Sequence, residues 1–253
     1  MLPVKALLLA VGLVVAGSPV APAFAGQTHV AVAANFTDAA KEIATAFRQK
    51  TGHEAVLSFG SSGQLYMQIT QEAPFQILLS ADEERPRKLV DEGLGVASSR
   101  VTYAIGKLVL WSRDAGYVKG EETLKAAAFN KISIANPTAA PYGSAAIEAM
   151  KALGIFAKVE PKIVQGNSIA QAFQFIDSGN AELGFVAAAQ LAGHTGGSRW
   201  AVPQNLYTPI RQDAVLLKKA QTSQAALAFL AFLKGPDGKA IVQKFGYASD
   251  PES

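Results

Sequence analysis

The chain has 253 residues, with 23 Lys and Arg against 20 Asp and Glu, and it contains no cysteine. A formal net charge of +3, with no cluster of basic residues, argues against a nucleic-acid-binding protein. The absence of cysteine excludes disulfides and a lipid-bearing cysteine, and a chain of this length can bury a core without such cross-links. The length suits one large domain or two small ones.

The first segment, residues 1–25, has the pattern of a secretory signal peptide. Lys5 gives a positive start, Ala6 to Gly17 form an apolar run, and Ala23-Phe24-Ala25 form an A-x-A cleavage site. The apolar run is too short to span a bilayer and no stop-transfer pattern follows it, so the alternative of a membrane anchor is disfavoured. We therefore expect a periplasmic protein, secreted across the inner membrane, that begins near Gly26.

Four strand-like apolar runs each end in a turn of small or polar residues, after which a helical pattern begins. The four turns are Asn35 to Asp38, Gly60 to Gly63, Asn136 to Gly143 and Gln165 to Ser168. Side-chain oxygens at such turns cap helices, and the free N–H groups and dipole of the helix start also favour an anion. A cap alone would explain one such turn. Four of them without Lys, Arg or His indicate a set of neutral hydrogen-bond donors.

The rest of the chain alternates strand-like and helical segments, which predicts an α/β fold with mostly parallel sheets. Three adjacent acids, Asp82, Glu83 and Glu84, are interpreted as solvated charges at a helix start, because neighbours on a helix do not converge on one metal ion. The remaining predicted strands are Ile77 to Ser80, Lys107 to Ser112, Leu183 to Val186 and Asp213 to Leu217. Two C-terminal helices are predicted over Ser223 to Leu233 and Lys239 to Phe245, separated by a break at Gly235-Pro236-Asp237.

Motifs of common enzymes are missing from the sequence. Gly60-Ser61-Ser62-Gly63 is not the G-x-S-x-G nucleophile elbow, and no dinucleotide-binding or P-loop pattern occurs. The histidines His29, His53 and His194 are interpreted as surface residues, and none shares a predicted helix with a second metal ligand. A Ser-His-Asp triad stays open as an alternative, although nothing places a histidine beside the two serines. We predict no catalytic residue.

Several stretches in combination resemble the periplasmic molybdate-binding proteins of ABC transporters. The resemblance covers nearly the whole chain after residue 25, in the same order. The serine turn by itself is shared with other oxyanion-binding relatives, whereas the combination is more specific. The stretches are Val32 to Thr37, Ser58 to Leu65, Leu79 to Asp82, Asn136-Pro137 with Ala140 to Gly143, Tyr207 with Pro209 to Ala214, and Phe232 to Pro236 with Phe245-Gly246.

The resemblance implies a type II periplasmic binding protein, a two-lobed α/β fold with the ligand cleft between the lobes. Each lobe would be a mostly parallel sheet flanked by helices. Lobe 1 would comprise residues 26–105 and 212–253, and lobe 2 residues 106–211. Two crossing strands near Tyr103 to Lys107 and Pro209 to Asp213 would join the lobes and act as the hinge when they close on the ligand.

In this family the oxyanion is held by main-chain N–H and hydroxyl groups at helix starts. Carried over by position, the ligand-binding residues would be Ala34, Asn35 and Ser62 from lobe 1, and Tyr142 and Ile169 from lobe 2. Ile169 would contribute only its main chain. Two of the five keep a structural alternative, since Asn35 could serve only as a cap and Tyr142 could serve only as a packing aromatic.

The chain departs from the family pattern at three positions. Asn35 replaces a serine that some members have. Ala187 stands where some members place a ligand-binding tyrosine, and because its methyl group cannot donate, Tyr142 is expected to supply that hydroxyl. Gln76 replaces a commonly acidic residue, a change to which we attach no functional interpretation.

The function implied by the resemblance is a periplasmic solute-binding protein, and not an enzyme, that captures molybdate or tungstate. It would deliver this ligand to the inner-membrane permease of an ABC importer. Molybdenum would be present only within the oxyanion, without direct protein–metal ligands and without a cofactor. We expect a monomer that binds no nucleic acid. Sulfate or phosphate is the alternative ligand, and a serine-dependent hydrolase is a more distant alternative function.

An anion site made only of donors also predicts an order of ligands. Molybdate is a dianion without a proton at neutral pH, whereas hydrogen phosphate carries an O–H group that requires an acceptor. Burying that donor without a partner costs about 1–3 kcal/mol. Sulfate has no such proton and would be disfavoured by its smaller size alone.

Overall fold

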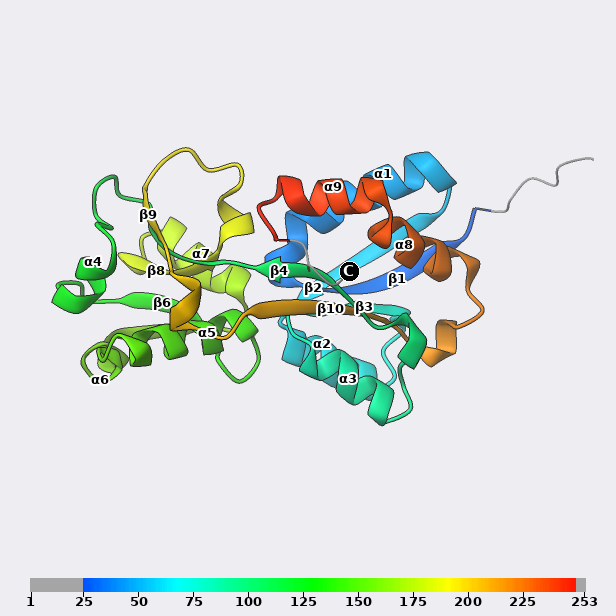
Figure 1. The fold of residues 1–253 in the computed structure, drawn as a ribbon, viewed down its shortest axis with the longest axis horizontal. Coiled ribbons are helices and arrows are strands. Elements are labelled where there is room, and N and C mark those ends of the chain that lie inside the picture. The colour runs from blue at the N-terminus through cyan, green and yellow to red at the C-terminus, as the bar shows by residue number, and fades with distance from the viewer. Residues whose placement is uncertain (1–24, 249–253) are drawn as a thin grey trace, which may run out of the picture.

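The computed structural model describes residues 25–248, so the predicted signal peptide lies outside the described residues except for Ala25. Two five-stranded sheets form the framework, in the strand orders β2-β1-β3-β10-β4 and β7-β6-β8-β5-β9. Figure 1 shows the two sheets with their helices placed end to end along the molecule, and β4 and β10 running between them. Among the described residues, no helix combines the length and the apolar character needed to cross a membrane.

The first sheet combines the N-terminal strands with one strand from late in the chain. Strands β2 and β3 pair in parallel with β1, whereas β10 pairs antiparallel with both β3 and β4. The strands are β1 (Gln27–Ala33), β2 (Glu54–Gly60), β3 (Ile77–Leu79), β4 (Val101–Gly106) and β10 (Ile210–Leu216). The helices of this half are α1 (Thr37–Thr51), α2 (Ser62–Thr70), α3 (Glu84–Asp91), α8 (Gln224–Lys234) and α9 (Pro236–Lys244).

The second sheet is built entirely from the middle of the chain. Strands β7 and β8 pair in parallel with β6, and β5 pairs antiparallel with β8 and β9. The strands are β5 (Leu108–Ser112), β6 (Ile132–Ala135), β7 (Ile163–Gly166), β8 (Leu183–Ala187) and β9 (Ser198–Ala201). The helices are α4 (Glu121–Ala126), α5 (Pro141–Ala152), α6 (Phe156–Val159) and α7 (Ile169–Asp177).

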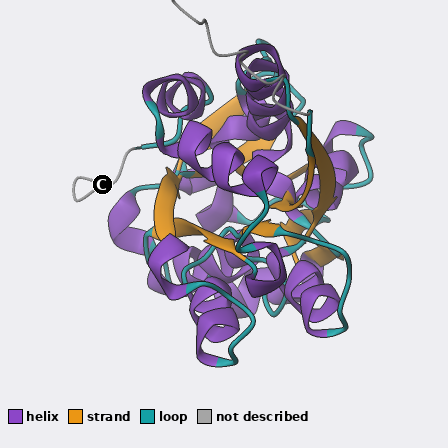
Figure 2. Ribbon diagram, turned by 90° about the vertical axis from the view of Figure 1, so that its right-hand side faces the viewer, coloured by secondary structure: helices purple, strands orange, loops and turns teal. Residues whose placement is uncertain are grey.

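The predicted α/β fold of two sheets flanked by helices is confirmed. The sheets are mixed rather than mostly parallel, because each has two parallel and two antiparallel strand pairs. Helices lie around the strands when the molecule is viewed along its length (Figure 2). The antiparallel pairs arise where the chain passes between the two halves, because β4 and β10 run in opposite directions between them. A single residue, Lys107, separates β4 in the first sheet from β5 in the second.

Helix α1 illustrates how the sequence covers one face of the first sheet. Ile43 and Phe47 lie one turn apart on its apolar face and are fully buried. The ring of Phe47 meets that of Phe229 in α8 edge to face, with centroids 5.3 Å apart. Gly52 ends the helix with φ = 75°, a left-handed conformation that glycine adopts without steric cost.

One predicted helix boundary is wrong at the C-terminus. Gly235 does end α8, but Pro236 is the first residue of α9 rather than part of a break. A proline at this position lacks only an N–H that would have no acceptor within the helix, and its fixed φ suits the first turn. The last helix therefore begins three residues earlier than the predicted start at Lys239.

The second sheet requires a residue without a side chain at Gly184 in β8. A Cβ atom there would lie 2.3 Å from the main-chain oxygen of Ser133 in β6 and 2.8 Å from Cδ1 of Ile176 in α7. Both neighbours belong to the packed core, so neither can move away freely.

We therefore expect Gly184→Ala to lower the free energy of unfolding by about 1–3 kcal/mol, the usual cost of overpacking a core. Gly193→Ala is the matched control, because a Cβ at Gly193 would meet nothing within 4 Å. Its effect should stay within about 0.5 kcal/mol. Urea unfolding of both variants measures the difference, and equal midpoints would contradict this account of the sheet.

Candidate functional site

The four predicted turns form two pairs, one at an edge of each sheet. In the first sheet, Ala33 at the end of β1 pairs with Gly60 at the end of β2. In the second sheet, Ala135 at the end of β6 pairs with Gly166 at the end of β7. Because parallel strands in register end at the same edge, the segments that follow them start side by side, which is where open α/β sheets bind ligands.

The serine turn contains one capping residue and one residue with a different role. Ser61 caps α2, since its Oγ accepts from the N–H of Gln64 at 3.4 Å and the Gln64 side chain accepts from the Ser61 N–H at 3.3 Å. Ser62 is buried, and its Oγ accepts from the N–H of Ala81 at 2.9 Å. The oxygen of Ser62 is thereby engaged as an acceptor, which leaves its hydroxyl hydrogen for another partner.

Asn35 lies in the 3-10 turn η1 (Ala34–Phe36) and does not act as a cap. Its amide nitrogen donates to Oε1 of Gln212 at 2.8 Å and to Oη of Tyr247 at 3.0 Å. Oη of Tyr247 in turn donates to the main-chain oxygen of Asn35 at 2.8 Å. Both amide hydrogens of Asn35 therefore have partners within the protein, and its capping alternative is not supported.

Tyr142 lies in the first turn of α5, directly after Pro141, and only 1% of its surface is exposed. Its Oη accepts from Nε2 of Gln212 at 3.2 Å. Burial raises the pKa of Tyr142 well above the usual value, and the side-chain hydrogen bonds of Gln212 and Asn35 oppose this only in part. The hydroxyl therefore keeps its proton at neutral pH and can donate. The ring also packs in a buried apolar cluster, so the packing role and the donor role coexist.

The side chain of Gln190 links Ala187 to Ile169 at the start of α7. Ser168 caps α7 by accepting from the N–H of Gln171 at 3.3 Å. The side chain of Gln190 accepts from the N–H of Ala187 at 2.9 Å and donates to the carbonyl of Ile169 at 3.2 Å. The N–H of Ile169, the first residue of α7, has no acceptor within its own helix.

The structure brings all of the predicted site residues to the junction of the two sheets. Ala34, Tyr142 and Ile169 belong to one buried cluster, which also contains Ala81, the partner of Ser62. Asn35 joins the same place through its bond to Gln212, which also bonds Tyr142. Each of the five predicted residues is buried at this junction.

Gln212 and Tyr247 are neighbours of the site that the sequence did not indicate. Gln212 lies within a stretch that carries the family resemblance, but no spacing links it to residues 177 positions earlier in the chain. Tyr247 follows the last helix, where a lone aromatic residue has no distinguishing pattern.

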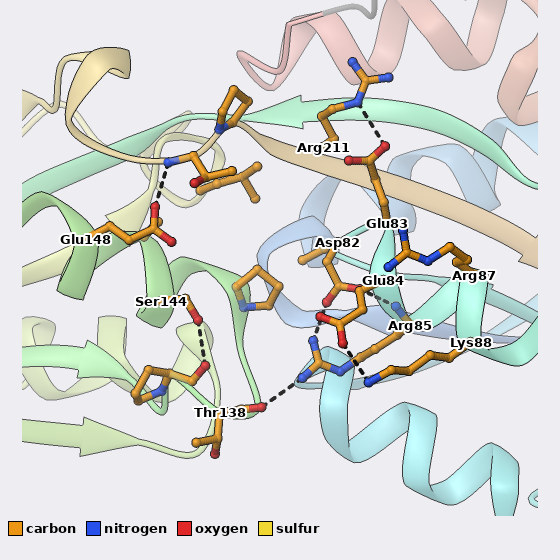
Figure 3. Close-up of a pocket in the computed structure, with 17 residues that line it drawn as sticks. Asp82, Glu83, Glu84, Arg85, Arg87, Lys88, Thr138, Ser144, Glu148 and Arg211 are labelled. Carbon is orange, nitrogen blue, oxygen red and sulfur yellow. Dashed lines mark hydrogen bonds and ion pairs between the residues drawn. The ribbon is translucent and has the colours of Figure 1, made fainter.

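Two hydrogen bonds to main-chain carbonyls cross the cleft and hold the halves together at its edge. The N–H of Gly63 in α2 donates to the carbonyl of Ala139 at 2.9 Å. Arg85 of α3 donates through Nη2 to the carbonyl of Thr138 at 2.9 Å (Figure 3). Asp82 pairs with Arg85 and also accepts from its main-chain N–H at 2.9 Å. The interpretation of Asp82 as a solvated charge is therefore wrong, because it orients the arginine that crosses the cleft.

A groove of about 550 Å³ lies beside the site rather than in it, and none of the five predicted residues lines it. Figure 3 shows that the labelled charged side chains of the groove lie on the first half or on β10, apart from Glu148 of α5. Its acids and bases are matched, since Glu83 meets Arg211 at 3.1 Å and Glu84 meets Lys88 at 2.6 Å. Such paired charges give the groove no net attraction for an anion. The groove is lined by Asp82, Glu83, Glu84, Glu148, Arg85, Arg87, Lys88 and Arg211 among others.

The three histidines have neighbours other than Ser61 and Ser62 of the serine turn. Nδ1 of His53 accepts from the N–H of Gly26 at 2.9 Å, and His194 packs edge to face on Trp111 at 5.9 Å. His29 is half-buried within β1. In the part of the chain that the structure describes, no three His, Asp or Glu side chains group closely enough to hold a metal ion.

A family model described as bacterial extracellular solute-binding protein matches residues 28–248. The chain is 52% identical over 229 residues to the molybdate-binding protein ModA of Rhodobacter capsulatus, covering 90% of this chain and 91% of the relative. It is 50% identical over 236 residues to the ModA of Azotobacter vinelandii, covering 92% and 94%. A solved periplasmic molybdate-binding protein of Azotobacter vinelandii superposes with a TM-score of 0.85 at 41% identity, covering 88% of this chain and 99% of that one.

The contact between Gly63 and Ala139 gives a test of the closed arrangement. A Cβ on Gly63 would lie 3.0 Å from Cα and 3.2 Å from the carbonyl oxygen of Ala139, both main-chain atoms. Because this contact would have to give by a few tenths of an ångström, we expect Gly63→Ala to shift the equilibrium toward an open arrangement and so to increase the radius of gyration measured by solution scattering. Because alanine favours a helix more than glycine by about 1 kcal/mol, the melting temperature should not fall.

Gly196→Ala is the control for this scattering experiment, since a Cβ at that position meets nothing within 4 Å. The control should scatter like the wild type. If Gly63→Ala also scatters like the wild type, its contact with Ala139 does not determine the closed arrangement.

Proposed function

Because the chain belongs to the family of bacterial extracellular solute-binding proteins, we propose that it captures molybdate, and tungstate as well, in the periplasm. It delivers the oxyanion to the inner-membrane permease of an ABC importer. Like the relatives named above, which are named as binding proteins, it is a binding protein and not an enzyme. The observation that carries the ligand assignment is the near full-length identity to proteins named for molybdate binding.

The proposed contacts are hydrogen-bond donors at the starts of η1, α2, α5 and α7. Ala34, Asn35 and Ile169 contribute main-chain N–H groups, because the first turn of a helix leaves these without acceptors. Ser62 and Tyr142 contribute hydroxyl groups. The amide of Asn35 already serves Gln212 and Tyr247, so in this proposal its side chain supports the site rather than contacting the anion.

Nearby carboxylates are engaged elsewhere, which supports a site without acceptors. Asp82 pairs with Arg85, and Asp213 accepts from Thr102 at 2.7 Å and from Arg100 at 3.0 Å. A dianion without a proton satisfies an all-donor site completely, whereas a protonated oxyanion leaves its own O–H without a partner. Molybdenum then enters only as the bound oxyanion, and no cofactor is required.

Closure of the two halves is the second part of the proposal. The contacts come from both sides of the junction, so the ligand is fully bonded only when the halves meet, and it thereby stabilises the closed state. The hinge consists of β4 and β10, the two strands that run between the halves (Figure 1). We place lobe 1 in residues 26–105 and 212–253 and lobe 2 in residues 106–211.

The location of the protein belongs to the same proposal. The pattern of residues 1–25 supports secretion across the inner membrane by a signal peptide. We propose that the mature protein acts as a monomer, because one molecule contributes every contact named above.

A thermal-shift screen of oxyanions tests the ligand. A ligand that binds only the folded state at about 1,000 times its dissociation constant adds about 4.1 kcal/mol to stability. We expect molybdate and tungstate to raise the melting temperature most, sulfate far less and phosphate least. Competition titrations at pH 7 and 8.5 give the same order. Phosphate binding as tight as molybdate would require a carboxylate in the site and would overturn the proposal.

Removing one hydroxyl tests the role of Tyr142. We expect Tyr142→Phe to weaken molybdate binding by about 1.5–3 kcal/mol, the range for a hydrogen bond to a charged group. This corresponds to about ten- to over a hundredfold in the dissociation constant. Because burial raises the pKa of Tyr142, its hydroxyl stays protonated and the loss should be equal at pH 7 and 8.5.

Tyr117→Phe is the control for this calorimetric measurement, since Tyr117 is half-buried in another part of the second half. It should bind molybdate like the wild type. An unchanged dissociation constant in Tyr142→Phe would assign Tyr142 to packing alone.

A further inference from the structure

A network of buried hydrogen bonds links the two halves of the molecule behind the proposed ligand site. Its members are Asn35, Gln212, Tyr142 and Tyr247, and each is at least 95% buried. Gln212 lies on β10, where the pairing with β4 shifts register between Gln212 and Asp213. Its side chain meets Tyr142 directly above Gly106, and only glycine leaves room for this contact. A Cβ at Gly106 would lie 2.1 Å from Oη of Tyr142 and 2.7 Å from Nε2 of Gln212.

The directions of the bonds among these four residues are set at one end. Tyr103 joins them at Gln212, with its Oη 3.2 Å from Oε1 of Gln212 and 3.0 Å from the main-chain oxygen of Ser80. The main-chain oxygen of Asn35 can only accept, so Tyr247 at 2.8 Å must give it the hydroxyl hydrogen. The oxygen of Tyr247 then has no hydrogen for the Asn35 side chain 3.0 Å away, and the atom facing it must be the amide nitrogen. The orientation of the Asn35 amide is therefore fixed.

The fixed amide of Asn35 determines the orientation of Gln212. The nitrogen of Asn35 lies 2.8 Å from the Gln212 side chain, so the facing atom of Gln212 must be the acceptor Oε1. The other end of the Gln212 amide is then the donor Nε2, which gives a hydrogen to Oη of Tyr142 at 3.2 Å. The hydroxyl of Tyr142 is thus held with its oxygen toward Gln212.

A hydroxyl held in this way can donate its hydrogen into the site but does not present an acceptor there. We propose that Gln212 is a positioning residue that determines specificity, because it makes Tyr142 a donor only and so excludes oxyanions that carry a proton. This inference rests on the function proposed above and extends it to a residue that does not contact the ligand. Ser62 is held similarly, since its oxygen accepts from the N–H of Ala81.

Sulfate and hydrogen phosphate form the best pair of probes for this inference. At pH 8.5 both are tetrahedral dianions of similar size, and they differ chiefly in the single proton of hydrogen phosphate. The ratio of their dissociation constants therefore measures rejection of the proton and is insensitive to pocket size or overall stability.

The experiment measures this phosphate-to-sulfate ratio by competition against bound molybdate, in the full mature chain. Gln212→Met removes the donor while keeping the length of the side chain, so the Tyr142 hydroxyl can turn and accept from hydrogen phosphate. We expect the ratio to fall at least about fivefold, the lower end of the effect of leaving a buried donor unpaired. In the Tyr142→Phe background the same substitution should leave the ratio unchanged, because no hydroxyl remains to be oriented.

Tyr247→Phe gives a second test from the far end of the network, since it removes the hydroxyl that fixes the Asn35 amide. It should lower the ratio in the same direction without any change at Gln212. Thr102→Val is the control, because it removes a part-buried hydrogen bond to Asp213 on the same strand pair, outside the network. The control should keep the wild-type ratio.

Two results would overturn the inference, and they are distinguishable from failure of the proposed function. A wild-type ratio in both Gln212→Met and Tyr247→Phe would make the network a purely structural link. An equal fall of the ratio with and without the Tyr142 hydroxyl would show that Gln212 does not act through Tyr142. A wild-type protein that binds no oxyanion at all would instead overturn the proposed function, and the inference with it.

Discussion

A main-chain N–H group can only donate, and the junction of this molecule depends on gathering such groups where water is excluded. Each sheet contributes two turns because its parallel strands end in register, Ala33 beside Gly60 and Ala135 beside Gly166. A neutral donor costs less to bury than a charged side chain, so the site needs no lysine or arginine. No lysine or arginine is buried among the residues that the structure describes, so the hydroxyls of Ser62 and Tyr142 are oriented by neutral neighbours.

Local chemistry in the sequence was sufficient to predict the turns, the alternation of strands and helices, and the helix starts at the four turns, although not the start of α9. A side-chain cap at the start of α2 was predicted from the serines of the turn, and the structure shows that Ser61 forms it together with Gln64, three residues later. Gln212 could not be predicted in the same way, since its partners Asn35 and Tyr142 lie far away in the chain. Asp82 was misjudged for a related reason, because the carbonyl reached by its partner Arg85 belongs to the opposite half.

Glycines determine how closely the two halves approach each other. Gly106 leaves the space through which Tyr142 reaches Gln212, and Gly63 allows α2 to touch the main chain of Ala139. The contact at Gly63 is a hydrogen bond between main-chain atoms, so it does not depend on the identity of Ala139. The close approach of the halves therefore depends on the lack of a side chain at Gly63 and Gly106 as much as on the polar groups around them.

The placement of β10 has a consequence for the order in which the molecule can assemble. All strands of the second sheet lie between Leu108 and Ala201, so that sheet is complete within one continuous segment. The first sheet needs β10 between β3 and β4, and β10 follows the whole second half in the chain. The N-terminal strands β1 to β4 therefore cannot complete their sheet until β10 is available. The middle segment, in contrast, can fold as soon as its own residues are available. Tyr247, the residue that orients the Asn35 amide, lies near the end of the chain, so the proposed ligand site gains its final geometry only when almost the whole chain is available to fold.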